Sequence, residues 1–225
     1  IIIASRTAPK LALSKLKIAD NLIEVSTSEL KFSFEQTKVY FSRFGDIQLN
    51  EEQICKLYEL TEGWPAALKL STFLIKQPEQ LSQLTVDGKV TSELFDDYLI
   101  ENIFNHKSAE QQEFLVKTSI LSEFNLPLCQ HLLADTFSAG RAATMLNEDL
   151  EESILIESTN QQQSWLSYHQ LFASFLIKLL KRDYAEQVEP LHVKAAKWFK
   201  ENNRPRLAIE HAIAGNANEL AAQMM

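Results

Sequence analysis

Few residues in this 225-residue chain combine a reactive side chain with a setting that suits chemistry, and His169 is the clearest of them. It lies in the run Trp-Leu-Ser-Tyr-His-Gln-Leu-Phe at residues 165–172, where a short strand pattern passes directly into a long amphipathic helix pattern. The first turn of a helix carries unpaired N–H groups and a partial positive charge, so it attracts anions. A histidine at that junction is expected either to cap the helix or to contact a phosphate.

Two other places combine suitable residue types with a suitable position. Arg6 follows the apolar run Ile1–Ala4, which is typical of a buried parallel strand, and ligands bind at the carboxyl ends of such strands. The alternative is an arginine that pairs with a surface acid. Gly63, Trp64 and Pro65 interrupt a helical pattern and are typical of a helix start with proline in the first turn and a buried tryptophan. That structural role is compatible with a proline ring that lines a ligand pocket.

Patterns that would support catalysis or metal binding are missing from the sequence. Gly88-Lys89 is followed by Val90 and lacks the earlier glycine of a phosphate-binding P-loop, and no Gly-x-Ser-x-Gly nucleophile motif occurs. Asp96 and Asp97 lie in an amphipathic helical pattern, which favours a solvated helix face over a Walker B strand. We therefore expect this chain not to be an enzyme by itself. The other candidate metal ligands show no ligand spacing: His106, His131, His192, His211, Cys55 and Cys129.

Composition bounds the class of protein. Apolar residues make up 45% and charged residues 23% of the chain, as in soluble globular proteins, and the net charge of −8 argues against a basic nucleic-acid surface over the whole chain. No apolar run is long enough to span a membrane. The two cysteines lie far apart among apolar residues, so we expect buried free thiols in a reducing, cytoplasmic compartment. The start, Ile-Ile-Ile-Ala, is unlike a signal peptide and indicates a fragment of a longer protein.

Hydrophobic periodicity predicts a mainly α-helical fold in four parts. Residues 1–30 contain two short strand patterns, Ile1–Ala4 and Leu22–Val25, and are typical of the last part of an α/β domain. Residues 31–90 are predicted to form a small helical domain. Its helices are expected from capping-box patterns and apolar spacing at Ser33–Gly45, from Asn50 through Tyr58, and at Ala66–Ile75, with a connection at Gln77–Lys89.

Residues 91–183 are predicted to form a winged-helix domain, because helices precede a strand pair that is followed by another helix. Residues 184–225 are predicted to start a helical-repeat array, with asparagines at the turn where a left-handed residue is needed. The expected elements are helices at Ser92–Asn105, from Ser108, from Pro127, at Ser138–Leu150, Leu171–Leu180, Leu191–Lys200, Arg206–Ala214 and from Glu219, and strands at Ile154–Glu157 and Ser164–Tyr168.

Five short motifs occur in order along the chain. They are Ile-Ile-Ile-Ala-Ser-Arg at 1–6, Thr-Glu-Gly-Trp-Pro at 61–65, Thr-Ser-Ile-Leu at 118–121, Tyr-His-Gln-Leu-Phe at 168–172 and Ala-Ile-Glu-His-Ala-Ile-Ala at 208–214. With this order and spacing, the chain resembles the large LuxR-type activators of the MalT kind, which belong to the signal-transduction ATPases with numerous domains (STAND ATPases). The resemblance covers essentially the whole chain.

The resemblance implies a P-loop nucleotide-binding domain, to which residues 1–30 would belong, followed by a helical domain, a winged-helix domain, a helical sensor array and a C-terminal DNA-binding domain. It implies that ADP holds an inactive monomer. An inducer, either a small molecule or a regulatory protein, would then permit self-association with bound ATP and Mg²⁺. The parent protein would be a slow ATPase switch that contacts DNA only through the C-terminal domain, which this sequence lacks, and no membrane would be involved.

The resemblance also assigns roles to residues. Arg6 matches the arginine after the sensor strand, near the terminal phosphate of the nucleotide. Gly63, Trp64 and Pro65 match the Gly-x-Pro element, whose proline packs beside the adenine. His169 matches the winged-helix histidine that contacts the phosphates of ADP. Cationic and N–H donors suit phosphate oxygens, and an apolar ring suits a purine face. The P-loop and the magnesium-binding acids would lie upstream of this sequence.

Two other classes of function remain open from the sequence. A winged-helix module that binds DNA without nucleotide control would need a basic recognition helix, but the candidate Ser138–Leu150 carries only Arg141 against Glu148 and Asp149. A basic cluster at Lys178, Lys181 and Arg182 is expected to solvate a helix end, where cations are favoured. A helical scaffold for protein–protein interaction would instead show a concave apolar groove in its C-terminal helices.

Overall fold

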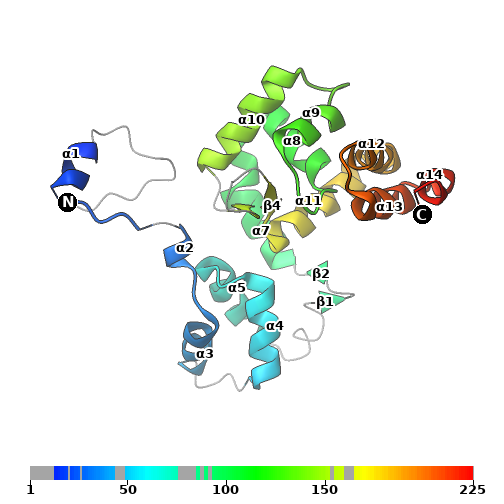
Figure 1. The fold of residues 1–225 in the computed structure, drawn as a ribbon. Helices are drawn as coiled ribbons and strands as arrows, with labels where there is room; N and C mark the ends of the chain where they lie inside the picture. The colour runs from blue at the N-terminus through cyan, green and yellow to red at the C-terminus, as the bar shows by residue number, and fades with distance from the viewer. Residues whose placement is uncertain are drawn as a thin grey trace. The chain divides into compact units, whose positions relative to one another are not determined.

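Helices dominate the structure, a computed structural model that describes residues 13–19, 21–25, 27–43, 49–75, 85–86, 89–90, 93–152, 155–159 and 165–224 (Figure 1). Among these residues, the strands form two short antiparallel pairs, so the predicted mainly α-helical class is confirmed. The chain divides into two units, residues 1–98 and residues 99–225, and each is described by itself. No helix in the described ranges is long and apolar enough to cross a membrane.

The first unit contains the predicted helical segments. Its elements are α1 (Leu13–Ile18), α2 (Thr27–Leu30), α3 (Phe34–Ser42), α4 (Glu51–Thr61), α5 (Pro65–Ile75), the hairpin β1 (Thr85–Val86) with β2 (Lys89–Val90), and the start of α7 (Glu93–Asn102). Both predicted capping boxes are present. In the first, the Ser33 hydroxyl accepts from the Gln36 amide at 3.2 Å, and the Gln36 side chain accepts from the Ser33 amide at 2.8 Å. Asn50 and Gln53 make the equivalent pair before α4.

One strand prediction in the first unit is wrong, and others lie outside the described residues. Residues 21–25 adopt no strand, and the Ile23 side chain is 91% exposed. An apolar run becomes a strand only where a neighbouring strand pairs with it, and no strand pairs with this run in the described part of the chain. The predicted strand Ile1–Ala4, Arg6 and the helix end at Gly45 lie outside the described residues. The hairpin β1–β2 lies at the end of the predicted connection Gln77–Lys89 and extends one residue beyond it, to Val90.

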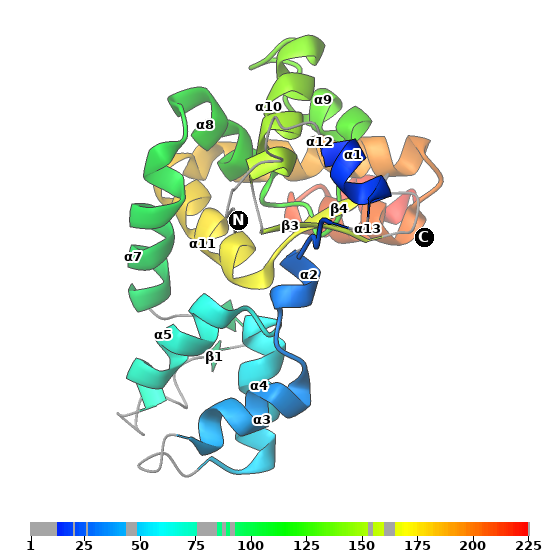
Figure 2. The ribbon, with the colours of Figure 1, turned by 90° about the vertical axis from the view of Figure 1, so that its left-hand side faces the viewer.

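The second unit follows the predicted winged-helix order. After α7 come a 3₁₀ turn η1 (Phe104–His106), α8 (Ala109–Thr118), α9 (Leu126–Leu132), α10 (Ala139–Glu152), β3 (Ile156–Ser158), β4 (Leu166–Tyr168) and α11 (Gln170–Asp183). In the β3–β4 pair, Ile156 lies opposite Tyr168 and Ser158 opposite Leu166. Phe124 forms an additional bridge to Leu166. Figure 2 shows β4 leading directly into α11, which places His169 at the junction between them.

Aromatic side chains fill the interior of this unit. Phe114, Phe124, Phe172 and Phe175 are each at most 1% exposed, and the rings of Phe172 and Phe175 stack with centroids 6.1 Å apart. Complete burial of such a side chain stabilises a fold by about 1.5–3 kcal/mol. Three of these rings lie on or beside α8 and α11, so the core fixes α11 and the residue that precedes it.

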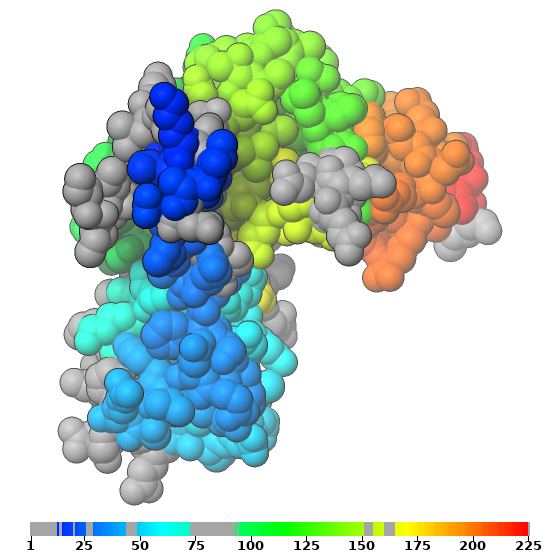
Figure 3. Space-filling model, turned by 60° about the vertical axis from the view of Figure 1, so that its left-hand side comes forward, coloured from blue at the N-terminus to red at the C-terminus, as the bar shows by residue number. Residues whose placement is uncertain are grey.

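The C-terminal helices form the predicted hairpin. The hairpin consists of α12 (Val188–Glu201) and α13 (Pro205–Ala214), preceded by the 3₁₀ turn η2 (Ala185–Gln187) and followed by α14 (Asn218–Ala222). Helix α12 begins three residues before its predicted start at Leu191. Pro190 therefore lies in its first turn, where the missing N–H of proline is tolerated. The turn residue Asn203 has φ +56°, as predicted. Small residues allow the close helix packing: Ala196, Ala212 and Ala221 are almost fully buried. In Figure 3, α12–α14 are the orange-to-red surface of this unit.

Candidate functional site

A tight turn between α4 and α5 explains the glycine of the Gly-Trp-Pro element. Glu62 and Gly63 have φ values of +49° and +70°, so the backbone is left-handed at both residues. The Gly63 carbonyl accepts a hydrogen bond from the Phe32 amide at 2.8 Å. A Cβ atom on Gly63 would lie 2.0 Å from the Phe32 carbonyl oxygen. Only glycine therefore fits this turn without a rearrangement of the backbone.

The next two residues start α5. The Trp64 amide donates to the Thr61 carbonyl at 2.8 Å, and the indole is 7% exposed and meets Tyr98 edge-on with ring centroids 5.9 Å apart. Pro65 is the first residue of the helix and is exposed. The predicted helix start with a buried tryptophan is confirmed. The contact of Pro65 with an adenine stays a prediction.

His169 caps the N-terminus of α11. Its Nδ1 atom accepts a hydrogen bond from the Leu171 amide at 3.3 Å, and its own amide donates to the Leu155 carbonyl at 2.7 Å. Because Nδ1 accepts a hydrogen bond, the neutral ring carries its proton on Nε2. The side chain is only 2% exposed, a burial that the sequence did not predict. The ring is thus fixed at the positive end of a 14-residue helix with Nε2 as a donor.

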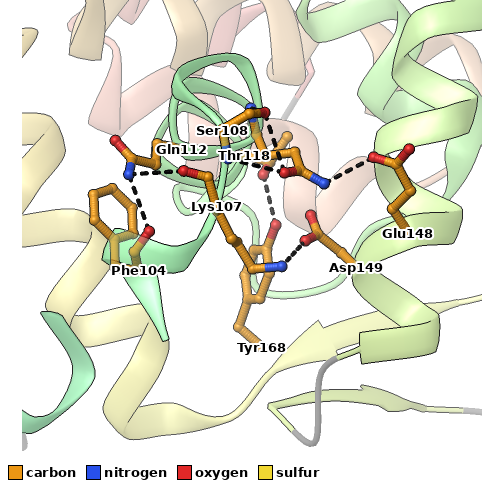
Figure 4. Close-up of polar contacts among 9 residues, drawn as sticks. Phe104, Lys107, Ser108, Gln112, Thr118, Glu148, Asp149 and Tyr168 are labelled. Atoms are coloured by element: carbon orange, nitrogen blue, oxygen red, sulfur yellow. Dashed lines mark hydrogen bonds and ion pairs between the residues drawn. The ribbon is translucent and has the colours of Figure 1, made fainter. Parts of the chain in front are cut away.

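A buried hydroxyl pair holds the residue before His169. The Tyr168 hydroxyl lies 2.7 Å from the Thr118 hydroxyl (Figure 4). The Thr118 hydroxyl also donates to the Phe114 carbonyl at 2.7 Å. Burial raises the pKa of Tyr168 well above its ordinary value, so the phenol stays neutral and can donate. Two of the five sequence motifs, those beginning at Thr118 and at Tyr168, therefore meet in the interior.

Beside this pair, an ion pair that the sequence did not reveal joins the entrance of α8 to the end of α10. The side chains of Lys107 and Asp149 form the ion pair and are 6% and 0% exposed (Figure 4). Gln111 donates to Glu148 at 2.8 Å next to it. Sequence inspection placed Asp149 only among the acids of a candidate recognition helix, because no local pattern indicates a partner 42 residues away.

The surface of α10 does not resemble a nucleic-acid interface. Arg141 is the single basic residue in this helix and forms an ion pair with Glu110 at 2.7 Å. Asp149 faces the interior, as described above.

Within the described ranges, no group of three or more His, Cys, Asp or Glu side chains could hold a metal ion. Asp96 and Asp97 lie on α7 and are partly or fully exposed, so their predicted place on a helix is confirmed.

The predicted site residues fall into separate parts of the chain. Gly63, Trp64 and Pro65 are consecutive in the first unit, and His169 belongs to the second unit. Arg6 lies outside the described residues. Residues that sequence reasoning missed are Thr118 and Tyr168 as a buried pair and Lys107 with Asp149. Thr118 and Tyr168 each belong to one of the five sequence motifs, and this membership was the one sequence feature that pointed to either residue.

Comparison with known proteins shows which proteins this chain resembles. Residues 100–188 match the family model described as the MalT winged helix domain. The chain is 27% identical over 214 residues, 95% of its length, to the serine/threonine-protein kinase PknK of Mycobacterium tuberculosis, of which it covers 19%. It is 27% identical over 219 residues, 96% of its length, to the HTH-type transcriptional regulator MalT of Serratia proteamaculans, of which it covers 24%. MalT of Yersinia enterocolitica is 26% identical over 217 residues. The chain thus spans about a fifth to a quarter of the length of these relatives.

Proposed function

Because the chain is MalT-like and carries a MalT winged-helix domain at residues 100–188, we propose that it is the regulatory part of an adenine-nucleotide-dependent transcriptional activator. In this proposal it couples the nucleotide state to inducer sensing and self-association in the cytoplasm. Catalysis belongs to a P-loop elsewhere in the parent protein, a slow ATPase switch that uses Mg²⁺. DNA is contacted through a separate C-terminal domain.

The observation that carries this proposal is the geometry of His169. Nδ1 accepts from the helix amide of Leu171, so Nε2 carries a proton, and a phosphate oxygen of ADP is a suitable acceptor for it. The positive end of α11 favours the same anion. The buried Thr118–Tyr168 pair holds β4 and so limits the movement of the histidine backbone.

His169 would then act as a latch. Its contact with the phosphates of ADP holds the winged-helix domain in the inactive arrangement, and loss of the contact frees the domain. Because the side chain is 2% exposed, phosphate access requires a local rearrangement of the residues that cover it. Pro65, exposed at the start of α5, would pack beside the adenine, with Gly63 and Trp64 holding the turn. Arg6 would contact the terminal phosphate.

A regulatory role for this segment would explain why it is shared by relatives with different named activities. One relative carries the name of a protein kinase, and the others carry the name of transcriptional regulators. The segment they share with this chain would be a switch that can be joined to either output. A winged helix that itself binds DNA is a weaker candidate, because the one basic residue of α10 is already paired with Glu110.

The test separates the helix cap from the phosphate contact. ADP binding to the complete protein is measured by calorimetry for the wild type, His169→Ala and His169→Ser. Serine is a good N-cap residue but has no Nε2 donor, so both variants should bind ADP about tenfold or more weakly. Only the alanine variant should also lose the stability of the cap, about 1 kcal/mol relative to serine in chemical unfolding.

Activity in transcription provides the second measurement. Both variants should activate the target promoter without inducer, because the latch is lost. Unchanged ADP affinity in both variants would leave His169 as a helix cap only. A protein that binds no adenine nucleotide at all would reject the proposed function and favour the helical scaffold.

A further inference from the structure

A cavity of about 590 Å³ lies in the second unit, on a side of β4 that does not involve His169. Three segments form it: the loop after α8, the β3–β4 pair and the turn into α13. Cavities of this size hold small molecules. Its lining combines hydroxyl, amide, guanidinium and carboxylate groups with two apolar side chains, and the residues are Ser122, Glu123, Thr159, Ser167, Asn203, Arg204, Pro205, Arg206 and Leu207.

Arg204 is held in place within this lining. Its Nη1 atom donates to the Glu123 carboxylate at 3.1 Å, and its guanidinium lies over the Trp165 ring, 4.6 Å from the centroid. The Arg204 amide donates to the Phe199 carbonyl at 2.9 Å, which fixes the backbone. A guanidinium that is stacked on one face presents its donors in a fixed plane, which suits a carboxylate or a phosphate.

The pairing with Glu123 is open to exchange. The Arg204 and Glu123 side chains are 44% and 28% exposed, so solvent reaches the ion pair. Exposed pairs of this kind contribute little net stability, and another anion can replace one partner. Arg206 lies at the same wall, but its Nε atom already pairs with Glu210 at 2.8 Å, so Arg204 is the residue on which binding of an anion would depend.

From these contacts we propose that the cavity binds a small organic anion, a carboxylate or a phosphate ester, whose charged group replaces the Glu123 carboxylate as the partner of Arg204. The hydroxyls of Ser122, Thr159 and Ser167 supply hydrogen bonds, and Pro205 with Leu207 contacts the apolar part of the ligand. This site goes beyond the nucleotide switch proposed above and does not depend on it.

Binding would have a structural consequence. Glu123 lies between α8 and α9, and Arg204 directly precedes α13. Their ion pair therefore links the winged-helix domain to the first helical hairpin. A ligand that takes Arg204 from Glu123 contacts both segments in place of this weak ion pair, so in the proposed complex the ligand itself bridges the winged-helix domain and the hairpin.

The experiment is calorimetric titration of the protein with two probes, phenyl phosphate and benzoate, which carry the two kinds of anion on the same apolar ring. Arg204→Gln should weaken binding of the preferred probe about tenfold, because it removes the charge-assisted hydrogen bonds. Glu123→Gln should strengthen binding several-fold, because it removes the competing carboxylate. Arg141→Gln, which breaks a similarly exposed pair with Glu110, is the matched control and should leave binding unchanged.

The gain of affinity in Glu123→Gln keeps the test decisive, because a variant that fails to fold cannot bind more tightly. Saturable binding of either probe with this pattern supports the site, and the tighter probe identifies the anion. The absence of saturable binding by both probes would overturn the proposal. Equal affinity of the wild type and Arg204→Gln would do the same, as would a Glu123→Gln variant that binds no better than the wild type.

Discussion

The hydroxyl oxygens of Thr118 and Tyr168 lie 2.7 Å apart in the interior of the winged-helix unit. Thr118 ends α8 and Tyr168 ends β4, immediately before His169, so the contact ties the helical part of the unit to the junction at which α11 begins. Because the Thr118 hydroxyl donates to the Phe114 carbonyl, the Tyr168 phenol is the donor to Thr118. Two polar groups are thereby satisfied without water.

Substitution of this pair should show energetic coupling. Thr118→Val removes the acceptor and leaves a buried phenol unpaired, so the free energy of unfolding should fall by about 1–3 kcal/mol. Tyr168→Phe removes the donor and should cost about 1 kcal/mol. Urea unfolding of both single variants and the double variant should give a coupling energy of about 1 kcal/mol. Strictly additive losses would mean that the hydrogen bond contributes nothing.

Gly63→Ala should destabilise the first unit. The added Cβ atom would lie 2.0 Å from the Phe32 carbonyl oxygen, at a residue whose φ is +70°, so we expect a loss of at least about 2 kcal/mol. Gly140→Ala is the matched control, because a Cβ atom there meets nothing within 4 Å and the residue lies in α10. That control should be neutral or stabilising by up to about 1 kcal/mol. Thermal unfolding of the two variants measures the difference in stability. Equal losses in Gly63→Ala and Gly140→Ala would contradict the expected clash at residue 63.

Removal of one partner of the Lys107–Asp149 ion pair should lower the free energy of unfolding strongly, whereas replacement of both partners by apolar side chains should lower it little. Lys107→Met or Asp149→Leu alone leaves one buried charge without its partner and should destabilise the protein by about 3–5 kcal/mol. The double variant, with two apolar side chains, should recover most of that loss. Chemical unfolding of the three variants measures this. A double variant as unstable as the sum of the single variants would show that the two charges act independently.

The contact between α12 and α13 should make stability depend on pH. The Nδ1 atoms of His192 and His211 lie 2.9 Å apart. Burial, followed by the charge of His192, lowers the pKa of His211 from 6.5 to about 4, and burial together with Lys181 lowers the pKa of His192. The folded state thus binds fewer protons than the unfolded state between pH 6.5 and about 4.

The free energy of unfolding should therefore be highest above about pH 6.5 and should fall as the pH drops toward 4. The protonation of His211 should account for about 2–3 kcal/mol of this loss. Unfolding measured across this range should show the loss, and His211→Phe should reduce it by removing the titrating ring beside Phe199. His131→Gln, at an exposed position on α9, serves as the control and should preserve the slope. A pH dependence that survives in His211→Phe would assign it to other groups.

The two cysteines should differ in reactivity. Cys129 is fully buried, and burial raises the pKa of its thiol to about 12. Cys55 on α4 is only partly buried, and its Sγ atom lies 3.6 Å from an exposed Glu59 carboxylate oxygen, which corrects the expectation of two buried thiols. A thiol reagent should modify Cys55 in the native protein, and Cys129 only after unfolding. Modification of both at one rate would contradict the structure.

The sequence by itself determined the helices that begin with capping boxes, the strand pair before α11 and the order of a winged-helix domain. The signals for these features span only a few residues: a cap joins a residue to the amide three positions later, and a helix repeats its apolar face every three or four residues. The run Leu22–Val25 shows the limit of such signals, because its composition suits a strand but no neighbour in the described residues pairs with it.

Only the tertiary structure decided which distant side chains meet. Thr118 and Tyr168 are 50 residues apart, Lys107 and Asp149 are 42 apart, and Glu123 and Arg204 are 81 apart. The sequence placed His169 at a helix start, yet its burial and the nitrogen that caps α11 follow from packing around it. Pairing and burial depend on which surfaces the fold brings together, and that is a property of the whole unit, which no local pattern encodes.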